Sequence, residues 1–297
     1  MYHQPVMLSE CLAGLDIKPN GVYVDVTFGG GGHSKAILAE LSDRGRLFAF
    51  DQDPDARANA EAINDRRLTF VDANFRYLQK YLRLYGAGNV DGILGDLGVS
   101  SHQFDTARRG FSTRYDAKLD MRMNQRADLT AHQVLNEYSE TDLHKIFGMY
   151  GEVHNARTLA SAIISTRPIH TIDELKSVLQ RYAHRGKENK YFAQVFQAVR
   201  IEVNDELGAL QDFLSQSVEV LKPSGRLVVM AYHSLEDRLA KNFINKGKFH
   251  GEVDKDLYGN EIKPLQAINR KPIDPTDDEV ALNPRARSAK LRIAEKK

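Results

Sequence analysis

The sequence predicts an α/β protein in which a parallel sheet carries helices on both faces and is interrupted by one helical insertion. Three observations lead to this fold class. Strand-like and helix-like segments alternate through the first hundred residues, the alternation stops after about residue 105, and it returns after about residue 190. Such alternation is typical of parallel sheets covered by helices.

The amino-terminal half of the expected sheet has four strands with helices between them. Pro54 stands where a first helical turn tolerates proline, and Gly45 and Gly86 stand where helices should stop. In chain order we expect strand 22–28, helix 35–41, strand 46–50, helix 54–63, strand 68–71, helix 75–84 and strand 90–97.

The insertion is expected at 105–190, where the sequence shows helix-like segments and no convincing strand. These segments are 131–137, 140–150, 157–165 and 172–182. Apolar residues at three- and four-residue steps from Tyr191 to Leu221 then predict one long helix. A strand at 226–232, a helix at 234–245, a loop excursion over 247–284 and a last strand at 289–293 complete the expected order. The main domain would therefore consist of residues 1–104 and 191–297.

Composition places the chain among ordinary globular proteins. It has 297 residues, 42% hydrophobic and 27% charged, which suits one large core plus an insertion. Residues 1–11 lack the pattern of a secretion signal and no run is long enough to span a membrane, so we expect a cytoplasmic protein without membrane contact. Cys11, the single cysteine, excludes an internal disulfide and has no neighbouring Cys or His at metal-ligand spacing, so we expect no structural zinc site and place Cys11 in the core. No metal is predicted.

The net charge of +1 gives no global attraction to nucleic acid, so such binding would need local patches. Two basic segments occur, at 181–200 and 285–297. The first also holds interleaved aromatic residues that could stack on unpaired bases, namely Tyr182, His184, Tyr191 and Phe192. Solvated charged faces are an equally good interpretation of either segment.

The loop after the first expected strand contains four consecutive glycines, from Gly29 to Gly32, followed by His33. Glycines let a backbone pass close to a bound molecule. Asp51 follows about 20 residues later, at the end of the second strand, which is the spacing of a carboxylate that holds ribose hydroxyls. Together these features predict a site for a cofactor that contains a nucleoside.

The pattern of this loop excludes two common cofactor motifs. Counted from Gly29 or Gly30, no glycine stands at the sixth place, as a dinucleotide site requires. A phosphate-binding loop ends in Lys followed by Ser or Thr, whereas here Ser34 comes first. Asp25 followed by closely spaced glycines resembles the first motif of S-adenosylmethionine methyltransferases. The alternative is a tight turn with spare glycines, which Asp51 disfavours.

Two further segments follow expected strands at the same edge of the sheet, where ligands bind in such folds. Residues 96–103 begin with Asp96, and their small side chains allow close approach of a cofactor and an acceptor; an acid that caps a loop is the alternative. Residues 233–238 follow the strand at 226–232. Ser234 lacks the glycine-flanked elbow of a hydrolase and is expected to cap the next helix, with Asp237 three residues later.

Seven motifs stand in order along nearly the whole chain, in a match that runs from His3 to Ala294. They are 27–34 (TFGGGGHS), 96–101 (DLGVSS), 119–123 (LDMRM), 196–201 (FQAVRI), 203–207 (VNDEL), 233–238 (HSLEDR) and 283–288 (NPRARS). This set resembles the ribosomal RNA small subunit methyltransferase H family, also called MraW. The segment 151–157 matches loosely, and the loop 249–278 aligns poorly.

The resemblance implies a Rossmann-like S-adenosylmethionine methyltransferase sheet with an RNA-recognition insertion. It implies methyl transfer to the exocyclic N4 of a cytosine in the decoding region of 16S ribosomal RNA, with that RNA or the small ribosomal subunit as partner; a homodimer is left open. Carried over by motif, the residues at the methionine part of the cofactor would be Gly31, Gly32 and His33. Those at the ribose, the adenine and the reacting end would be Asp51, Phe75, Asp96 and Gln103.

The implied reaction needs a group that accepts a proton, because the lone pair of cytosine N4 is shared with the ring. We expect Asp96 in this role, with Asp120 and His233 as weaker candidates. A base inside a helix is unreachable, so the target should be unpaired or flipped. Two other classes remain open: a methyltransferase for DNA, protein or a small molecule, and an RNA-binding assembly factor without activity. An NAD-dependent oxidoreductase is a distant third.

Overall fold

The computed structural model describes residues 5–297, so the first matched residue of the resemblance, His3, lies outside the described residues. The chain forms two compact units, which we call the sheet unit (Met1–Gly98 and Leu207–Lys297) and the helical unit (Val99–Glu206). These borders differ from the expected ones at 104/105 and 190/191. The second border moves because the helix after residue 187 packs in the core of the helical unit.

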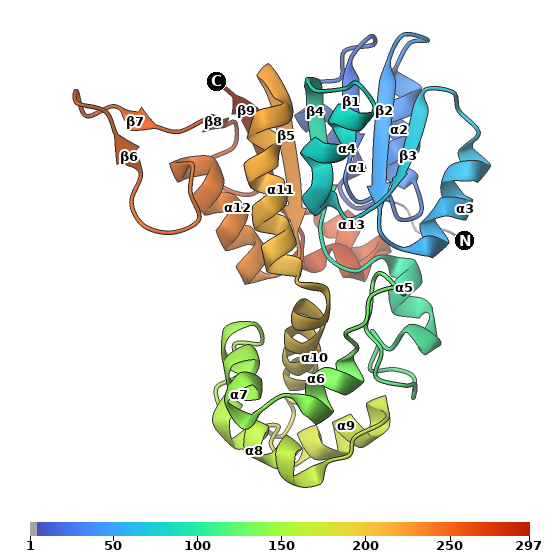
Figure 1. Ribbon diagram of the computed structural model, residues 1–297, viewed down its shortest axis with the longest axis vertical. Helices are drawn as coiled ribbons and strands as arrows, with labels where there is room; N and C mark the ends of the chain where they lie inside the picture. The colour runs from blue at the N-terminus through green and yellow to red at the C-terminus, as the bar shows by residue number, and fades with distance from the viewer. Residues whose placement is uncertain (1–4) are drawn as a thin grey trace. The chain divides into compact units, whose positions relative to one another are not determined.

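The sheet unit contains a seven-stranded sheet in the order β3-β2-β1-β4-β5-β9-β8 (Figure 1). The first five of these strands are parallel, while β9 runs antiparallel to both of its neighbours. Their bounds are β1 (Val22–Asp25), β2 (Arg46–Asp51), β3 (Leu68–Asp72), β4 (Val90–Asp96), β5 (Leu221–Ala231), β8 (Leu265–Ala267) and β9 (Lys290–Lys296). The predicted α/β fold class is confirmed, and the strand order reverses direction between β1 and β4.

Apolar cores lie on both faces of this sheet, as neighbouring residues of one strand show. On β4, Ile93 belongs to a core shared with α4 (Leu78–Leu84), α11 (Glu206–Val220) and α12 (Ser234–Lys246). The next residue, Leu94, belongs to a core shared with α1 (Leu8–Leu15) and α2 (Gly32–Glu40), which also contains Cys11. Burial on both sides explains why the strands are apolar runs rather than alternating patterns.

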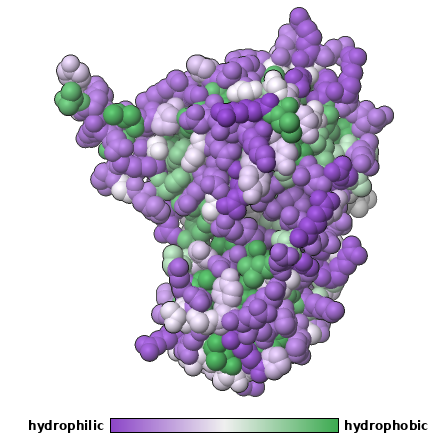
Figure 2. Space-filling model, in the orientation of Figure 1, coloured by the Kyte–Doolittle hydropathy of each residue, from purple (hydrophilic) through white to green (hydrophobic). Residues whose placement is uncertain are grey.

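Shorter elements complete the sheet unit. Helix α3 spans Pro54–Ile63, as predicted, and a single 3₁₀ turn, Phe75–Tyr77, precedes α4. The expected loop excursion carries β6 (Asp254–Lys255), β7 (Glu261–Ile262), β8, α13 (Asp277–Leu282) and a 3₁₀ turn, Pro284–Ser288. Figure 2 shows mostly polar residues on the visible face, with apolar side chains at the end of the arm that carries β6 and β7. Within residues 5–297, no helix combines the length and the apolar character that a bilayer span requires.

The helical unit is built, among its described residues, from six α-helices and one 3₁₀ turn, Ala107–Arg109, and has no strand beyond an isolated bridge between Lys118 and Thr171. One core joins α6 to α10, with Phe147, Leu159, Leu175 and Val199 fully buried. The α-helices are α5 (Ser101–Asp105), α6 (Ala131–Glu137), α7 (Glu140–Met149), α8 (Ala156–Thr166), α9 (Ile172–Gln180) and α10 (Glu188–Asn204).

The single long helix predicted from Tyr191 to Leu221 is wrong. The chain forms α10 and α11 instead, separated by Asp205, whose φ of 45° lies in the left-handed region that Asp tolerates. The apolar stripe of α10 packs in the core of the helical unit, whereas Leu210 and Leu214 of α11 pack in a core of the sheet unit. The two stripes share one period, so the pattern alone could not reveal the break.

Candidate cofactor and active site

Acidic side chains end four parallel strands at the carboxyl edge of the sheet. Asp25, Asp51, Asp72 and Asp96 are the last residues of β1, β2, β3 and β4. Asp25 pairs in register with Ala49 and Leu94, each two residues before the end of its own strand. The structure therefore brings Asp25, Asp51 and Asp96 to one edge, around the point where the strand order reverses and where open α/β sheets bind ligands.

The glycine loop between β1 and α2 has, at two positions, a left-handed backbone that favours glycine. Gly29 and Gly31 have φ values of 52° and 76°. A Cβ on Gly31 would lie 2.8 Å from the ring of Phe28, and a Cβ on Gly32 would lie 2.4 Å from Pro5 Cγ. Packing alone thus requires glycine at both cofactor positions that the sequence predicted.

Helix α2 begins at Gly32 rather than at the expected Lys35, and its N-cap residue is Gly31. No side chain caps this end of the helix. The N–H groups of a first helical turn have no partner within the helix and favour an anionic acceptor. The glycine loop therefore presents backbone donors at the ligand-binding edge of the sheet.

Asp25 fastens this loop to the sheet. Its carboxylate accepts a hydrogen bond of 2.7 Å from Ser34 Oγ and one of 3.1 Å from the backbone N–H of Thr27. Burial raises the pKa of this carboxyl, whose side chain is 1% exposed. Asp25 is thus a structural acid, and it holds the start of α2 against the end of β1.

Asp51 links the glycine loop to the second strand. Its Oδ2 accepts the N–H of Gly29 at 2.7 Å, and its Oδ1 accepts the N–H of Asp53 at 2.8 Å. Burial raises the pKa of the Asp51 carboxyl to about 6, although both hydrogen bonds oppose the rise. Each oxygen retains capacity for a further donor, as a carboxylate that holds ribose hydroxyls requires.

Asp96, at the end of β4, contacts side chains from two other segments of the sheet unit. Tyr232 donates its hydroxyl to Oδ1 at 2.8 Å, and Oδ2 lies 3.8 Å from Nδ1 of His33. Its own backbone N–H donates to Thr27 Oγ1 at 2.7 Å. Burial raises the pKa of this carboxyl to about 6, His33 and the Tyr232 hydroxyl lower it, and the charge of Asp25 adds to the rise. The side chain keeps 23% of its surface exposed.

Tyr232 is a site residue that sequence reasoning missed. It follows β5, and the preceding register, Met230 opposite Asp96, carries its side chain to the Asp96 carboxylate. Burial and the nearby Asp96 charge raise the pKa of the Tyr232 hydroxyl, which therefore stays protonated and donates. Its position beside the predicted 233–238 motif was the available signal.

His33 joins the loop to the amino-terminal segment. Its Nε2 lies 3.0 Å from the carbonyl oxygen of Val6. Because a carbonyl only accepts hydrogen bonds, Nε2 carries a proton, and Nδ1 faces Asp96.

Phe75, the predicted adenine contact, is half-buried and packs edge-to-face on Phe213 with 5.6 Å between ring centroids. Both residues belong to the sheet unit.

His233 caps α12, so the predicted cap at Ser234 is wrong. His233 Nδ1 accepts the backbone N–H of Glu236 at 3.4 Å, and its Nε2 lies 3.2 Å from Glu236 Oε1. A Glu236 oxygen also accepts the N–H of Tyr232 at 3.0 Å. Both ring nitrogens of His233 therefore face the first turn of the helix.

Two predicted site residues, Gln103 and Asp120, belong to the helical unit. Gln103 is buried and completes the capping box of α5, accepting the Ser100 N–H at 3.2 Å. Arg122 donates to both oxygens of Asp120, at 2.9 and 2.8 Å. Partial burial raises the pKa of the Asp120 carboxyl, but the hydrogen bonds and charge of Arg122 lower it overall.

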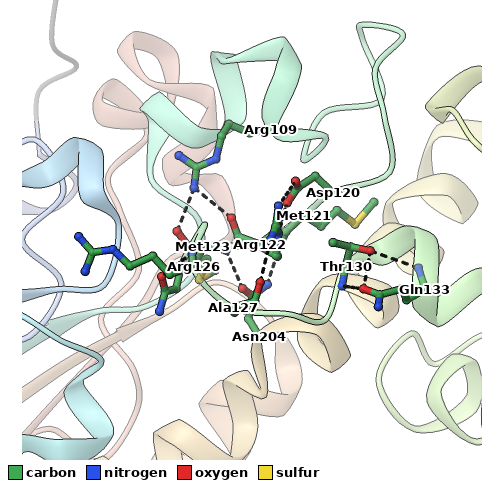
Figure 3. A network of polar contacts seen from close by, with 11 residues as sticks. Arg109, Asp120, Met121, Arg122, Met123, Arg126, Ala127, Thr130, Gln133 and Asn204 are labelled. Atoms are coloured by element: carbon green, nitrogen blue, oxygen red, sulfur yellow. Dashed lines mark hydrogen bonds and ion pairs between the residues drawn. The ribbon is translucent and has the colours of Figure 1, made fainter.

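The motif that contains Asp120 is clamped by two side chains that sequence reasoning missed (Figure 3). Buried Arg109 donates to the carbonyl oxygens of Arg122 and Met123 at 3.0 and 2.9 Å. Asn204, from α10, donates to Met121 O at 2.8 Å and accepts the Met123 N–H at 2.7 Å. Met121 holds a φ of 60°, so this loop has a fixed and unusual backbone.

At least three of the six cations of the basic segment at 285–297 have partners within the fold. Arg292 forms a two-pronged pair with Asp237 at 2.7 and 2.9 Å, and Lys290 pairs with Asp274. Lys296 donates to carbonyl oxygens near the start of β5. In the other basic segment, Tyr191 and Phe192 are buried in the core, so the expectation that they offer stacking surfaces is wrong.

Comparison with known proteins gives strong matches over the full length. The model of the MraW methylase family matches residues 1–297. The chain is 60% identical to ribosomal RNA small subunit methyltransferase H of Cytophaga hutchinsonii, with 100% of both chains covered. It is 57% identical to the protein of the same name from Flavobacterium johnsoniae, covering 99% of this chain and 98% of that one. Among solved structures, TrmN from Thermus thermophilus matches with a TM-score of 0.44 and 12% identity, over 98% of this chain and 48% of that chain. With a family model over its whole length and relatives above half identity, the chain belongs to the MraW methylase family.

Proposed function

We propose that the protein transfers a methyl group from S-adenosylmethionine to the exocyclic N4 of a cytosine in the decoding region of 16S ribosomal RNA. Membership of a methylase family supports the reaction type, and the names of the relatives support ribosomal RNA as acceptor. The observation that carries the chemistry is Asp96, a partly exposed carboxyl of raised pKa at the edge where the strand order reverses.

The sheet unit fits the chemical groups of this cofactor. The uncapped first turn of α2, at Gly32 and His33, would bind the methionine carboxylate, since that turn offers N–H donors. Asp51 would accept the ribose hydroxyls, and the partly exposed ring of Phe75 would lie against the adenine. When bound, the sulfonium supplies an already activated methyl group, so the protein's main task is alignment and exclusion of water.

Asp96 would accept a hydrogen bond from the N4 amino group and then take the proton that N4 releases. A pKa of about 6 leaves this carboxylate ionised at pH 7 and closer to neutrality than an ordinary aspartate, which suits a general base. Tyr232 would hold the carboxylate in orientation through its hydrogen bond.

The weaker candidates have contacts that reduce their basicity or availability. Arg122 already neutralises Asp120 and lowers the pKa of its carboxyl overall. His233 directs both ring nitrogens to the first turn of α12. For these reasons we rank Asp96 first and retain Asp120 and His233 behind it, while Gln103 stays a proposed contact near the reacting end of the cofactor.

The helical unit would recognise the RNA, as proposed for residues 105–190. A cytosine inside a duplex does not expose N4 to an in-line methyl donor, so the target should be unpaired or flipped. Either naked 16S RNA or the small ribosomal subunit would present it.

Transfer of labelled methyl tests this proposal. The acceptors are naked 16S RNA and small ribosomal subunits from a strain that lacks the protein, with DNA and total protein as alternative acceptors. We expect label in RNA only, and the better RNA substrate shows at which stage of assembly the enzyme acts. Label in DNA or protein alone, or none despite measured cofactor binding, would contradict the proposal.

A further inference from the structure

Residues 181–190, which comprise the turn between α9 and α10 and the first residues of α10 and which we call the α9–α10 turn, form a basic surface of the helical unit. Arg181, Arg185, Lys187 and Lys190 are all exposed. The turn has a defined backbone: the N–H of Lys187 donates to the carbonyl of His184 at 2.9 Å, and Gly186 adopts a φ of 77°. It therefore presents these cations from a fixed conformation.

None of these four cations has a carboxylate partner within 4.0 Å among residues 5–297. Elsewhere in the same unit, at least three cations have a carboxylate partner: Arg122 pairs with Asp120, Lys176 with Asp173 and Arg200 with Glu206. The one acid of the turn, Glu188, instead accepts the N–H of Gly186 at 3.0 Å. The Glu188 carboxylate thus binds a backbone N–H rather than one of the four cations, and those cations are exposed to solvent.

The base of the turn is anchored in the core. Tyr191 is buried and donates its hydroxyl to Asn155 Oδ1 at 2.9 Å, while Asn155 Nδ2 donates to the carbonyl of Tyr182 at 3.3 Å. Tyr191, Phe192 and the partly buried Tyr182 pack in or against the core, which leaves His184 as the exposed aromatic side chain beside four exposed cations. Lys and Arg without stacking partners suit phosphate groups rather than bases.

The other basic segment gives the contrast. In residues 285–297, Arg292 and Lys290 have acidic partners and Lys296 has carbonyl partners, while Arg287 and Lys297 are exposed. The charges of Arg292, Lys290 and Lys296 therefore have partners within the fold, whereas the four cations of the α9–α10 turn have no carboxylate partner among the described residues.

We propose that the turn at 181–190 binds the phosphate backbone of the RNA substrate, without sequence preference, and so holds the RNA while the target base reaches the active site. This inference rests on the proposed function, since it assumes an RNA acceptor. Phosphate contacts position a nucleic acid and release counterions, so they appear as salt-dependent affinity.

The test compares the full-length protein with the double variant Arg185→Gln/Lys187→Gln. Each lost phosphate contact reduces the salt dependence of log K by roughly 0.7–0.9, so two lost contacts should lower the slope by about 1.4–1.8. This corresponds to a loss of affinity of about 25- to 60-fold at 0.1 M salt relative to 1 M. We expect KM for 16S RNA to rise accordingly, with kcat and cofactor affinity unchanged. Direct binding of an unrelated single-stranded RNA should weaken by the same factor.

Two further variants control for charge and for folding. Lys80→Gln/Arg83→Gln removes the same charge from exposed positions of α4 and should leave KM near the wild-type value. Arg185→Lys/Lys187→Arg keeps the charge and should restore RNA affinity, because phosphate binding here depends on charge. An unchanged KM in the first variant, or an equal loss in the α4 control, would overturn the inference. Failure of the proposed function looks different, because the wild-type protein itself would then transfer no methyl to RNA.

Discussion

Replacing Asp96 by Asn should make the protein more stable while it abolishes methyl transfer. Burial raises the pKa of the Asp96 carboxyl from 3.8 to about 6, so the ionised form of Asp96 destabilises the folded protein. Asn is nearly the same size, and its Oδ1 can still accept the hydroxyl of Tyr232. The substitution therefore removes the buried charge and keeps the local packing.

The magnitude follows from proton linkage. A carboxyl whose pKa is higher in the folded state favours folding at low pH, and this advantage is lost as the pH rises through about 6. One pKa unit corresponds to about 1.4 kcal/mol, so the full cost of the charge is about 3 kcal/mol. Between pH 5 and pH 8 the difference between Asn and wild type should grow by about 1.4 kcal/mol in favour of Asn.

Chemical denaturation of both proteins at pH 5, 6, 7 and 8 measures this difference. The matched control is Asp120→Asn, since Arg122 pairs with that carboxylate and lowers its pKa. This control should destabilise the protein by an amount that is constant over the same pH range, because its pH dependence lies below about pH 4. A difference for Asp96→Asn that stays flat with pH, or that shrinks as the pH rises, would refute the reasoning.

Three other outcomes follow from the same contacts. The kcat of methyl transfer should rise with pH through about 6 as Asp96 ionises. Tyr232→Phe should shift this rise to higher pH, because it removes a hydrogen bond that lowers the pKa of Asp96. A pH–rate profile of both proteins checks this. Gly86→Ala, at positive φ with open space around the added Cβ, should cost about 1 kcal/mol in denaturation, and Gly31→Ala should cost more because its Cβ would lie 2.8 Å from the Phe28 ring. Only Gly31→Ala should weaken cofactor binding in calorimetry. Asn204→Ala removes the hydrogen bonds to Met121 and Met123, so it should lower the unfolding free energy by about 2–3 kcal/mol and raise KM for RNA. An unchanged melting temperature would contradict the inference that Asn204 holds residues 121–123 in place.

The parts of the site that could be predicted from the sequence are those fixed by local pattern. A glycine loop after an apolar run, followed by Asp51 and Asp96 at the ends of later runs, identifies the ligand edge because parallel strands end together. The structure places Gly31, Asp51 and Asp96 in one unit at that edge. Their contacts with cofactor and acceptor stay predictions.

The parts that escaped prediction depend on contacts between distant segments. Tyr232 lies 136 residues from Asp96, and no local pattern marks the hydrogen bond between them. Arg109 gives no periodic signal, because it donates to backbone carbonyls that any sequence would supply. Asn204 lies inside a matched motif, yet its clamp on residues 121–123 depends on tertiary structure.

The most direct test of the central claim is nucleoside analysis of 16S RNA from a strain that lacks the protein, after incubation with S-adenosylmethionine and either wild-type protein or Asp96→Asn. We predict N4-methylated cytidine from the decoding region with the wild type and almost none with the variant, at equal cofactor binding. Methylation at another atom or base, or full activity of Asp96→Asn, would contradict the account.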